Sequence, residues 1–86
     1  MAGTSDEVTL IEQCLSGARS DTVPEARQDL DLLLGTILAR ISPHDVMLVE
    51  GARILCYLHL HEIENAKGSP AGLKIALNSV RQLRRL

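Results

Sequence analysis

The chain has 86 residues, a formal net charge of −2 and 45% hydrophobic residues, with no Phe or Trp and a single Tyr. This length predicts one domain, residues 1–86, with a small core, and an apolar content this high excludes an intrinsically disordered chain. The slight negative charge disfavours a nucleic-acid-binding protein, and the scarcity of aromatic residues favours an aliphatic core between packed helices.

Charge is distributed unevenly along the chain. Residues 1–42 hold seven acidic and three basic residues, a net charge of −4, and residues 43–86 hold four acidic and six basic residues, a net charge of +2. Helices from the two halves are therefore expected to attract one another, within one chain or between subunits. Arg81, Arg84 and Arg85 are interpreted as complementing the dipole of a C-terminal helix rather than binding nucleic acid.

The two cysteines, Cys14 and Cys56, are too few for a disulfide framework and are interpreted as buried free thiols in a reducing compartment. Residues 1–4 are expected to be a flexible N-terminus, and the sequence there lacks the basic and apolar regions of a signal peptide. No apolar run approaches the roughly 20 residues of a membrane span. We therefore expect a soluble cytoplasmic protein without membrane contact.

Apolar residues three or four apart predict a first helix over 6–18 and a second over 23–41. Thr22 and Glu25 have the spacing of a capping box at the start of the second helix. Each helix has a clear inward face. These faces comprise Val8, Ile11, Leu15 and Ala18 in the first helix, and Ala26, Leu30, Leu33, Leu34, Ile37, Leu38 and Ile41 in the second.

The second helix has another face, opposite the first, on which Leu32, Gly35, Thr36 and Ala39 lie together. A glycine inside a helix costs roughly 1 kcal/mol relative to alanine, so a packing reason for Gly35 is expected. Small residues four apart let another helix approach closely, although a neutral exposed face is an equal alternative. Replacing Gly35 or Ala39 with Glu is expected to weaken association without loss of helicity.

A third helix is predicted over 43–67. Ser42 and Asp45 have capping spacing at its start. Lys67 and Gly68 are typical of its end, because a cation suits the last turn and glycine tolerates a left-handed backbone.

Apolar residues cover almost the whole circumference of this third helix, which predicts burial by neighbours on at least two sides. A strand over Ile54–His61 is the competing interpretation, because short apolar runs are ambiguous. The exception to the apolar cover is one narrow polar strip, formed by Glu50, Arg53, Tyr57, His61, Glu64 and Asn65.

A fourth helix is predicted over 70–85, opened by Ser69 and Pro70. Its inward stripe comprises Leu73, Ala76, Leu77, Val80 and Leu83. Short connections favour antiparallel neighbours, so the prediction is an all-α, antiparallel four-helix bundle with three long helices and one shorter, in which the third helix packs against the other three.

The residues able to do chemistry gather on the third helix. Cys56 and His59 are three apart, but two ligands do not make a zinc site, and a small bundle leaves little room for a cleft around a Cys–His nucleophile pair. His59 is interpreted as a core or interface histidine that is hydrogen-bonded to a carbonyl or a carboxylate. No catalytic residue, metal ion or cofactor is predicted.

The surplus of apolar helical surface predicts a non-enzymatic protein–protein interaction module: an adaptor, a co-chaperone or a regulatory subunit. A homodimer or a complex with another protein would cover that surface, and the chain is expected to be oligomeric. The expected interface comprises Leu32, Gly35, Thr36, Ala39, Leu55, Leu58 and His59.

Two alternatives stay open. A regulatory bundle would act through one side chain, either by phosphotransfer at His61, on the polar strip, or by redox sensing at Cys56. A nucleic-acid-linked regulator would use the C-terminal arginines and would show strongly salt-dependent binding.

Overall fold

Helices account for nearly all of the regular structure. The computed structural model describes residues 4–86, and this part of the chain contains no strand, so the all-α prediction is confirmed and the strand over Ile54–His61 is excluded. The elements in chain order, with η denoting a 3₁₀ turn, are α1 (Ser5–Gly17), α2 (Val23–Leu38), η1 (Pro43–Asp45), α3 (Val46–Glu64), α4 (Pro70–Arg81) and η2 (Gln82–Arg85).

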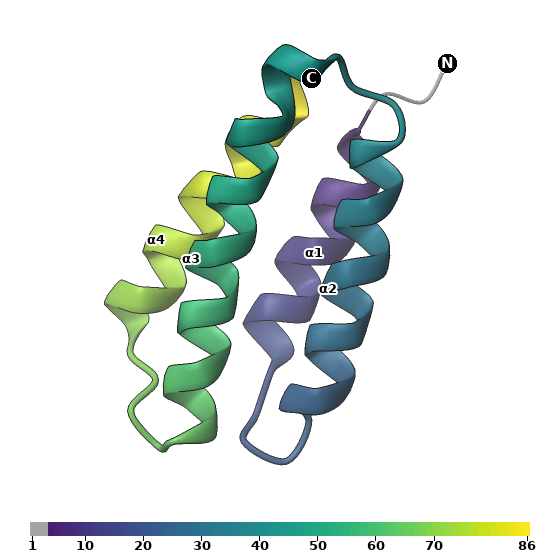
Figure 1. Ribbon diagram of the computed structural model, residues 1–86. Helices are drawn as coiled ribbons and strands as arrows, with labels where there is room; N and C mark the ends of the chain where they lie inside the picture. The colour runs from purple at the N-terminus through teal and green to yellow at the C-terminus, as the bar shows by residue number, and fades with distance from the viewer. Residues whose placement is uncertain (1–3) are drawn as a thin grey trace.

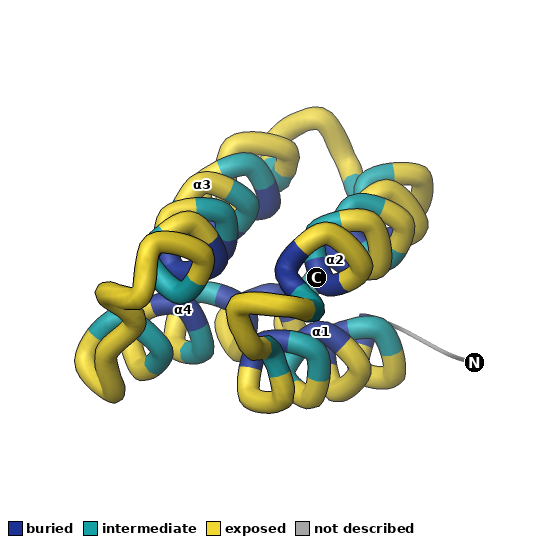
Figure 2. The backbone as a smooth tube through the Cα atoms, turned by 90° about the horizontal axis from the view of Figure 1, so that it is seen from below, coloured by how far each residue is buried: buried dark blue, intermediate teal, exposed yellow. Residues whose placement is uncertain are grey.

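The four helices form a ring in which each packs against two neighbours. α1 lies beside α2, α2 beside α3 and α3 beside α4, and α4 returns to α1, with consecutive helices antiparallel (Figure 1). Seen end on, the helices occupy the four corners of the bundle (Figure 2). Short loops favour this arrangement because they place each helix next to the one before it.

The core is aliphatic and draws on all four helices. Each helix buries residues three or four apart, as the sequence predicted, and full burial of one Leu or Ile contributes about 1.5–3 kcal/mol. The fully or almost fully buried residues are Val8, Ile11, Leu15, Val23, Leu30, Leu34, Ile37, Val49, Ala52, Cys56, Leu60, Ala76, Val80 and Leu83.

The expectation that the third helix packs against the other three is wrong. The main neighbours of α3 are α2 and α4, and α1 lies diagonally across the ring. One side of α3 therefore faces solvent, although that side is apolar, with Met47, Ile54 and Leu58 more than half exposed. The cause is the square arrangement, because a corner helix has only two adjacent helices to cover it.

The part of the polar strip of α3 that contains Arg53 and Tyr57 faces α2, whereas His61 and Asn65 are exposed. Arg53 donates a hydrogen bond from Nη1 to Oδ1 of Asp31 on α2 at 2.7 Å, and the hydroxyl of Tyr57 donates to the same oxygen. The guanidinium of Arg27 on α2 lies 5.9 Å from the centre of the Tyr57 ring, within cation–π range. This network joins α3 to α2 on one side of the helix.

The C-terminal end of α3 differs in detail from its predicted end. Ala66, and not Gly68, adopts the left-handed backbone, with φ of 59°. The Lys67 amide donates to the Glu62 carbonyl at 2.6 Å and the Ala66 amide donates to the Ile63 carbonyl at 3.0 Å, which is a Schellman motif. Gly68 instead allows the backbone to pack closely against Ile63, because a Cβ at Gly68 would lie 2.8 Å from Cγ1 of Ile63.

Capping side chains were predicted at the starts of the second, third and fourth helices, and the prediction is correct only for the fourth. Ser69 accepts from the Gly72 amide at 3.0 Å at the start of α4. Thr22 makes no cap bond to α2 and instead accepts from the Arg19 amide within the preceding turn. Ser42 precedes η1, where its hydroxyl donates to Asp45, so the α-helical part of the third helix begins at Val46.

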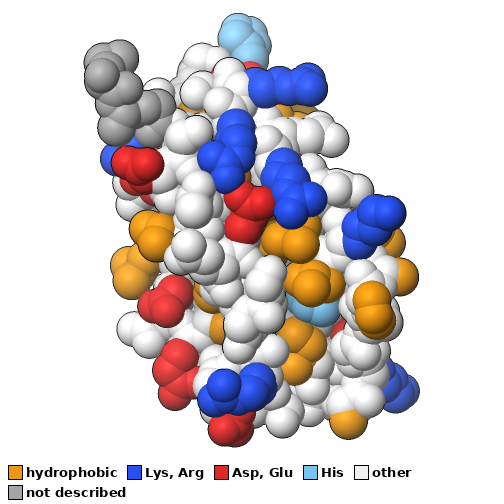
Figure 3. Space-filling view, turned by 180° about the vertical axis from the view of Figure 1, so that it is seen from behind, with side chains coloured by type: hydrophobic (Ala, Val, Ile, Leu, Met, Phe, Trp, Pro, Cys, Tyr) orange, Lys and Arg blue, Asp and Glu red, His pale blue; other side chains and the backbone are white. Residues whose placement is uncertain are grey.

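Attraction between the acidic and basic halves operates within the chain. Glu12 on α1 accepts from Nε of Arg81 at 2.7 Å and also from Arg84, so two basic residues share one carboxylate. Figure 3 shows basic side chains gathered around acidic ones on the face that α1 and α4 form. These arginines therefore pair with α1 in addition to lying at the end of α4.

Thr4 was expected in a flexible N-terminus, and residues 1–3 lie outside the described part of the chain. Thr4 itself is buried, and its hydroxyl donates to the Leu83 carbonyl at 2.6 Å. This bond ties the start of α1 to the end of the chain.

Candidate functional site

The predicted interface residues of α2 lie together on its outer side. Leu32, Gly35, Thr36 and Ala39 are all exposed, and a Cβ added at Gly35 would meet nothing within 4 Å. The Thr36 hydroxyl donates to the Leu32 carbonyl at 3.0 Å and so stays within its own helix. Leu32 is 66% exposed and is the one large apolar side chain among these four residues.

The predicted interface residues of α3 do not share a surface. Leu58 is 53% exposed on the outer side of the bundle. Leu55 is half-buried and lines a shallow groove between α3 and α4, together with Ser79. His59 is only 4% exposed and packs inward, which removes it from any flat interface.

A continuous apolar surface nevertheless runs along the outer side of α3, and we call it the α3 ridge. It consists of Met47, Gly51, Ile54 and Leu58, at intervals of four, three and four residues, which is the spacing of a coiled-coil seam. Met47 is 84% exposed and Ile54 65% exposed. Of these residues, the sequence analysis placed only Leu58 in an interface, and it expected neighbouring helices to cover the apolar surface of this helix on at least two sides.

A Cβ at Gly51 would meet nothing within 4 Å, so the ridge has an open notch in its middle. With Leu48 beside them, the exposed parts of the ridge side chains amount to apolar area on the order of 400–500 Å². This is the size of the largest apolar patch on a typical monomer, and such patches are often functional.

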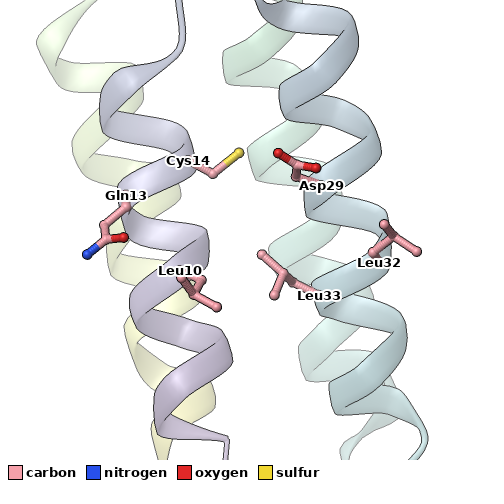
Figure 4. A pocket seen from close by; sticks show the side chains of 6 residues that line it. All are labelled: Leu10, Gln13, Cys14, Asp29, Leu32 and Leu33. Atoms are coloured by element: carbon pink, nitrogen blue, oxygen red, sulfur yellow. The ribbon is translucent and has the colours of Figure 1, made fainter.

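A second apolar surface is the α1–α2 groove, about 480 Å³ in volume (Figure 4). Cys14 points from α1 toward Asp29 on α2, and Leu10 and Leu33 approach one another below them. The Cys14 thiol donates to the Ala26 carbonyl at 3.4 Å. Burial, and then the Asp29 carboxylate, raise the pKa of Cys14, so the groove presents a neutral thiol rather than a nucleophilic thiolate.

The two side chains proposed for regulation are Cys56, as a redox sensor, and His61, as a phosphotransfer residue. The surroundings of Cys56 disfavour a reactive thiolate, and those of His61 are ordinary for an exposed histidine. Cys56 is fully buried, and burial raises its pKa to about 12, so the reactive thiolate is suppressed. His61 is exposed, with Nε2 3.1 Å from the side-chain nitrogen of Asn65. Neither environment adds support to redox sensing or to phosphotransfer.

A third surface, which we call the end groove, lies where the C-terminal ends of α1 and α3 meet the start of α4. Its volume is about 550 Å³, and its walls include Leu15, His59, Ile63 and Leu73. His59 is buried, as predicted, but the predicted hydrogen bond is absent at Nδ1, which has no partner in the described structure. Burial lowers the pKa of His59, and the nearby Glu62 carboxylate opposes this, so the ring is neutral at pH 7.

Comparison with protein-family models, with curated proteins and with solved structures found no significant match to this chain. Over residues 4–86, no helix is both long and apolar enough to cross a bilayer. The same residues include no group of three or more His, Cys, Asp or Glu side chains placed to hold a metal ion.

Proposed function

We propose that this chain is a non-enzymatic protein–protein interaction module, an adaptor or regulatory subunit, that pairs with a second copy of itself through the α3 ridge. The observation that carries the proposal is the seam of Met47, Gly51, Ile54 and Leu58, which is exposed along a helix whose opposite face is buried. Water-exposed apolar side chains at these intervals favour association with another helix.

Two copies of the ridge fit one another in an antiparallel arrangement. A two-fold axis midway between Ile54 and Leu55 sets Leu58 of each copy opposite Gly51 of the other. The open space above Gly51 then receives a leucine side chain, so a large residue meets a small one at two equivalent points. The ridge itself carries no charged residue, so this pairing brings no like charges together along the seam.

The buried area is adequate for a two-fold interface. Two ridges together remove apolar area on the order of 900 Å² from water, before any contribution from the polar rim. A specific interface needs about 1,000 Å² in total, so the proposed dimer requires further contacts beside the ridge. A reducing, cytoplasmic location belongs to the same proposal, because both cysteines are free thiols.

Light scattering after size exclusion, over a range of concentrations, tests the pairing. The wild-type chain is expected to form a dimer, and Ile54→Glu is expected to be monomeric with unchanged helicity. Leu10→Glu is the matched control, because Leu10 is 50% exposed on α1, diagonally across the ring from α3. A monomeric wild type, or an Ile54→Glu variant that still dimerises, would overturn the proposal.

A further inference from the structure

The α1–α2 groove continues toward the loop that joins its two helices. A second hollow of about 230 Å³ adjoins the one in Figure 4, and Gln13, Cys14 and Asp29 line both. Along α1 the two hollows extend from Leu10 to Gly17, which is about 10 Å or two helical turns. The α1–α2 groove therefore follows the two helices lengthwise.

The two ends of the groove differ in chemistry. At one end the walls are leucines, of which Leu10 is 50% and Leu32 is 66% exposed. At the other end, nearer the loop, the lining includes the small residues Cys14, Gly17, Ala18 and Ala26. A Cβ at Gly17 would meet nothing within 4 Å, so no neighbouring side chain covers the groove there.

Two carboxylates without counter-ions line the end of the groove nearer the loop. Glu25 and Asp29 are four residues apart on α2, and both are exposed. Neither forms an ion pair within residues 4–86. No Lys or Arg of these residues lines either hollow. The groove is therefore acidic at one end and apolar at the other.

Most other acidic residues of α1 and α2 are neutralised by arginines. These pairs are Glu7 with Arg40, Glu12 with Arg81, and Asp31 with Arg53. Arg27, which is the basic residue of α2, lies over the ring of Tyr57 on α3. The uncompensated negative charge of α2 is therefore concentrated at the groove, where it attracts a cationic partner and disfavours an acidic one.

An amphipathic helix is the occupant that fits both ends of the groove. The groove between two packed helices accepts the apolar face of a third. Asp29 and Glu25 precede Leu33 by four and eight residues on α2, so they lie about 6 and 12 Å along the helix from the leucine end. A helix with Lys or Arg one and two turns from its apolar residues matches these distances. The methylene groups of those side chains would cover the small residues of the groove.

We propose that the α1–α2 groove binds a basic amphipathic helix of another protein, with the apolar residues of that helix against Leu10 and Leu32 and its Lys or Arg side chains at Asp29 and Glu25. No residue of α3 lines the groove within residues 4–86. The site is therefore separate from the α3 ridge, and the proposal does not depend on dimerisation.

Two pairs of synthetic peptides test the groove. All are alanine-rich helices of roughly 18 residues with two leucines in one turn. One member of each pair has lysines one and two turns from the leucines on the same face, and the other has glutamates there. The two pairs differ in the order of leucines and charged residues, because a helix of either direction matches the spacing.

Each peptide is titrated at pH 7.5 into isotope-labelled protein, and binding is followed by NMR. The lysine peptide of one pair is expected to shift the amide signals of Cys14 and Gly17. It is expected to bind about tenfold more tightly than its glutamate counterpart, because the charges at Glu25 and Asp29 attract the first and repel the second. Added salt should reduce this preference.

Two variants identify the groups responsible. Glu25→Gln combined with Asp29→Asn is expected to remove the tenfold preference for lysine. Asp45→Asn combined with Glu62→Gln is the matched control, because it changes the net charge equally in η1 and α3, away from the groove. Leu32→Gln is expected to weaken binding of the lysine peptide about fivefold, and the exposure of Leu32 favours an unchanged fold.

Three results would overturn the proposal. The first is that no peptide binds, and the second is that the glutamate peptides bind as tightly as the lysine peptides. The third is that the lysine peptide shifts the amide signals of Gly51 and Ile54 instead of those of Cys14 and Gly17, which would place it on the α3 ridge.

Discussion

Asp31 on α2 accepts a hydrogen bond from Arg53 on α3 at 2.7 Å, and this contact joins α2 to the most apolar helix in the protein. At about 100° per residue, Met47, Ile54 and Leu58 lie opposite the buried residues Val49, Ala52 and Cys56. The α3 ridge is thus the side of α3 that lies opposite the core.

Asp31→Ala is expected to lower the free energy of unfolding by about 1–2 kcal/mol, because Arg53 and Tyr57 both lose their acceptor. Urea denaturation monitored by circular dichroism measures this loss. Asp21→Ala is the matched control, since the Asp21–Arg19 pair is about three-quarters exposed and is expected to contribute less than about 0.5 kcal/mol. Equal effects of the two substitutions would contradict a special role for Asp31.

Ala66→Gly is expected to raise the free energy of unfolding by about 1 kcal/mol. Ala66 has a left-handed backbone that alanine adopts with strain and glycine adopts freely. Thermal or urea unfolding measures the gain. Ala71→Gly, in the first turn of α4, should instead destabilise the protein, because glycine there only adds conformational entropy to the unfolded chain.

Gly51→Ala is expected to have two opposite effects. Its Cβ enters open space, so the monomer should gain about 0.5–1 kcal/mol from helix propensity. The same methyl group fills the notch proposed to receive Leu58 of a second copy, so the dimer should dissociate at higher protein concentration. Sedimentation equilibrium measures the second effect and urea unfolding of the dilute protein the first.

Gly35→Ala distinguishes between the two candidate interfaces, which are the α3 ridge and the face of Leu32 and Ala39 on α2. A Cβ at Gly35 would enter open space, as it would at Gly51, but Gly35 lies on α2. Gly35→Ala should stabilise the chain to a similar extent without changing dimerisation. If Gly35→Ala weakens the dimer while Gly51→Ala does not, the face of Leu32 and Ala39 is the interface and the α3 ridge is not.

Stability is expected to fall as the solution is acidified below neutrality, because burial lowers the pKa of His59 from its usual value of 6.5. The unfolded chain binds a proton near that value, whereas the folded chain binds it only at lower pH. The contribution of neutral His59 is therefore complete above about pH 6.5 and is lost as the pH falls toward the folded-state pKa. Urea midpoints from pH 7.5 to 5 should decline for the wild type and less for His59→Leu; parallel curves would contradict this assignment.

Helical periodicity was sufficient to predict the four helices and the buried faces of the first, second and fourth. Leu30, Leu34 and Ile37 face the core because their spacing repeats with the helical turn, and no tertiary information is needed to place them together. Helix ends were predicted less accurately. At the end of α3 two residues, Ala66 and Gly68, could provide the left-handed backbone, and the packing of Gly68 against Ile63 decided between them.

Helical periodicity does not predict what each face of a helix packs against. The polar strip of α3 was identified from the sequence, but its partner Asp31 lies on another helix and more than twenty residues away along the chain. The α1–α2 groove likewise combines residues of two helices, which sequence spacing does not bring together. Local backbone geometry determines which residues share a face, whereas only the packing of whole helices determines whether that face is buried, paired or exposed.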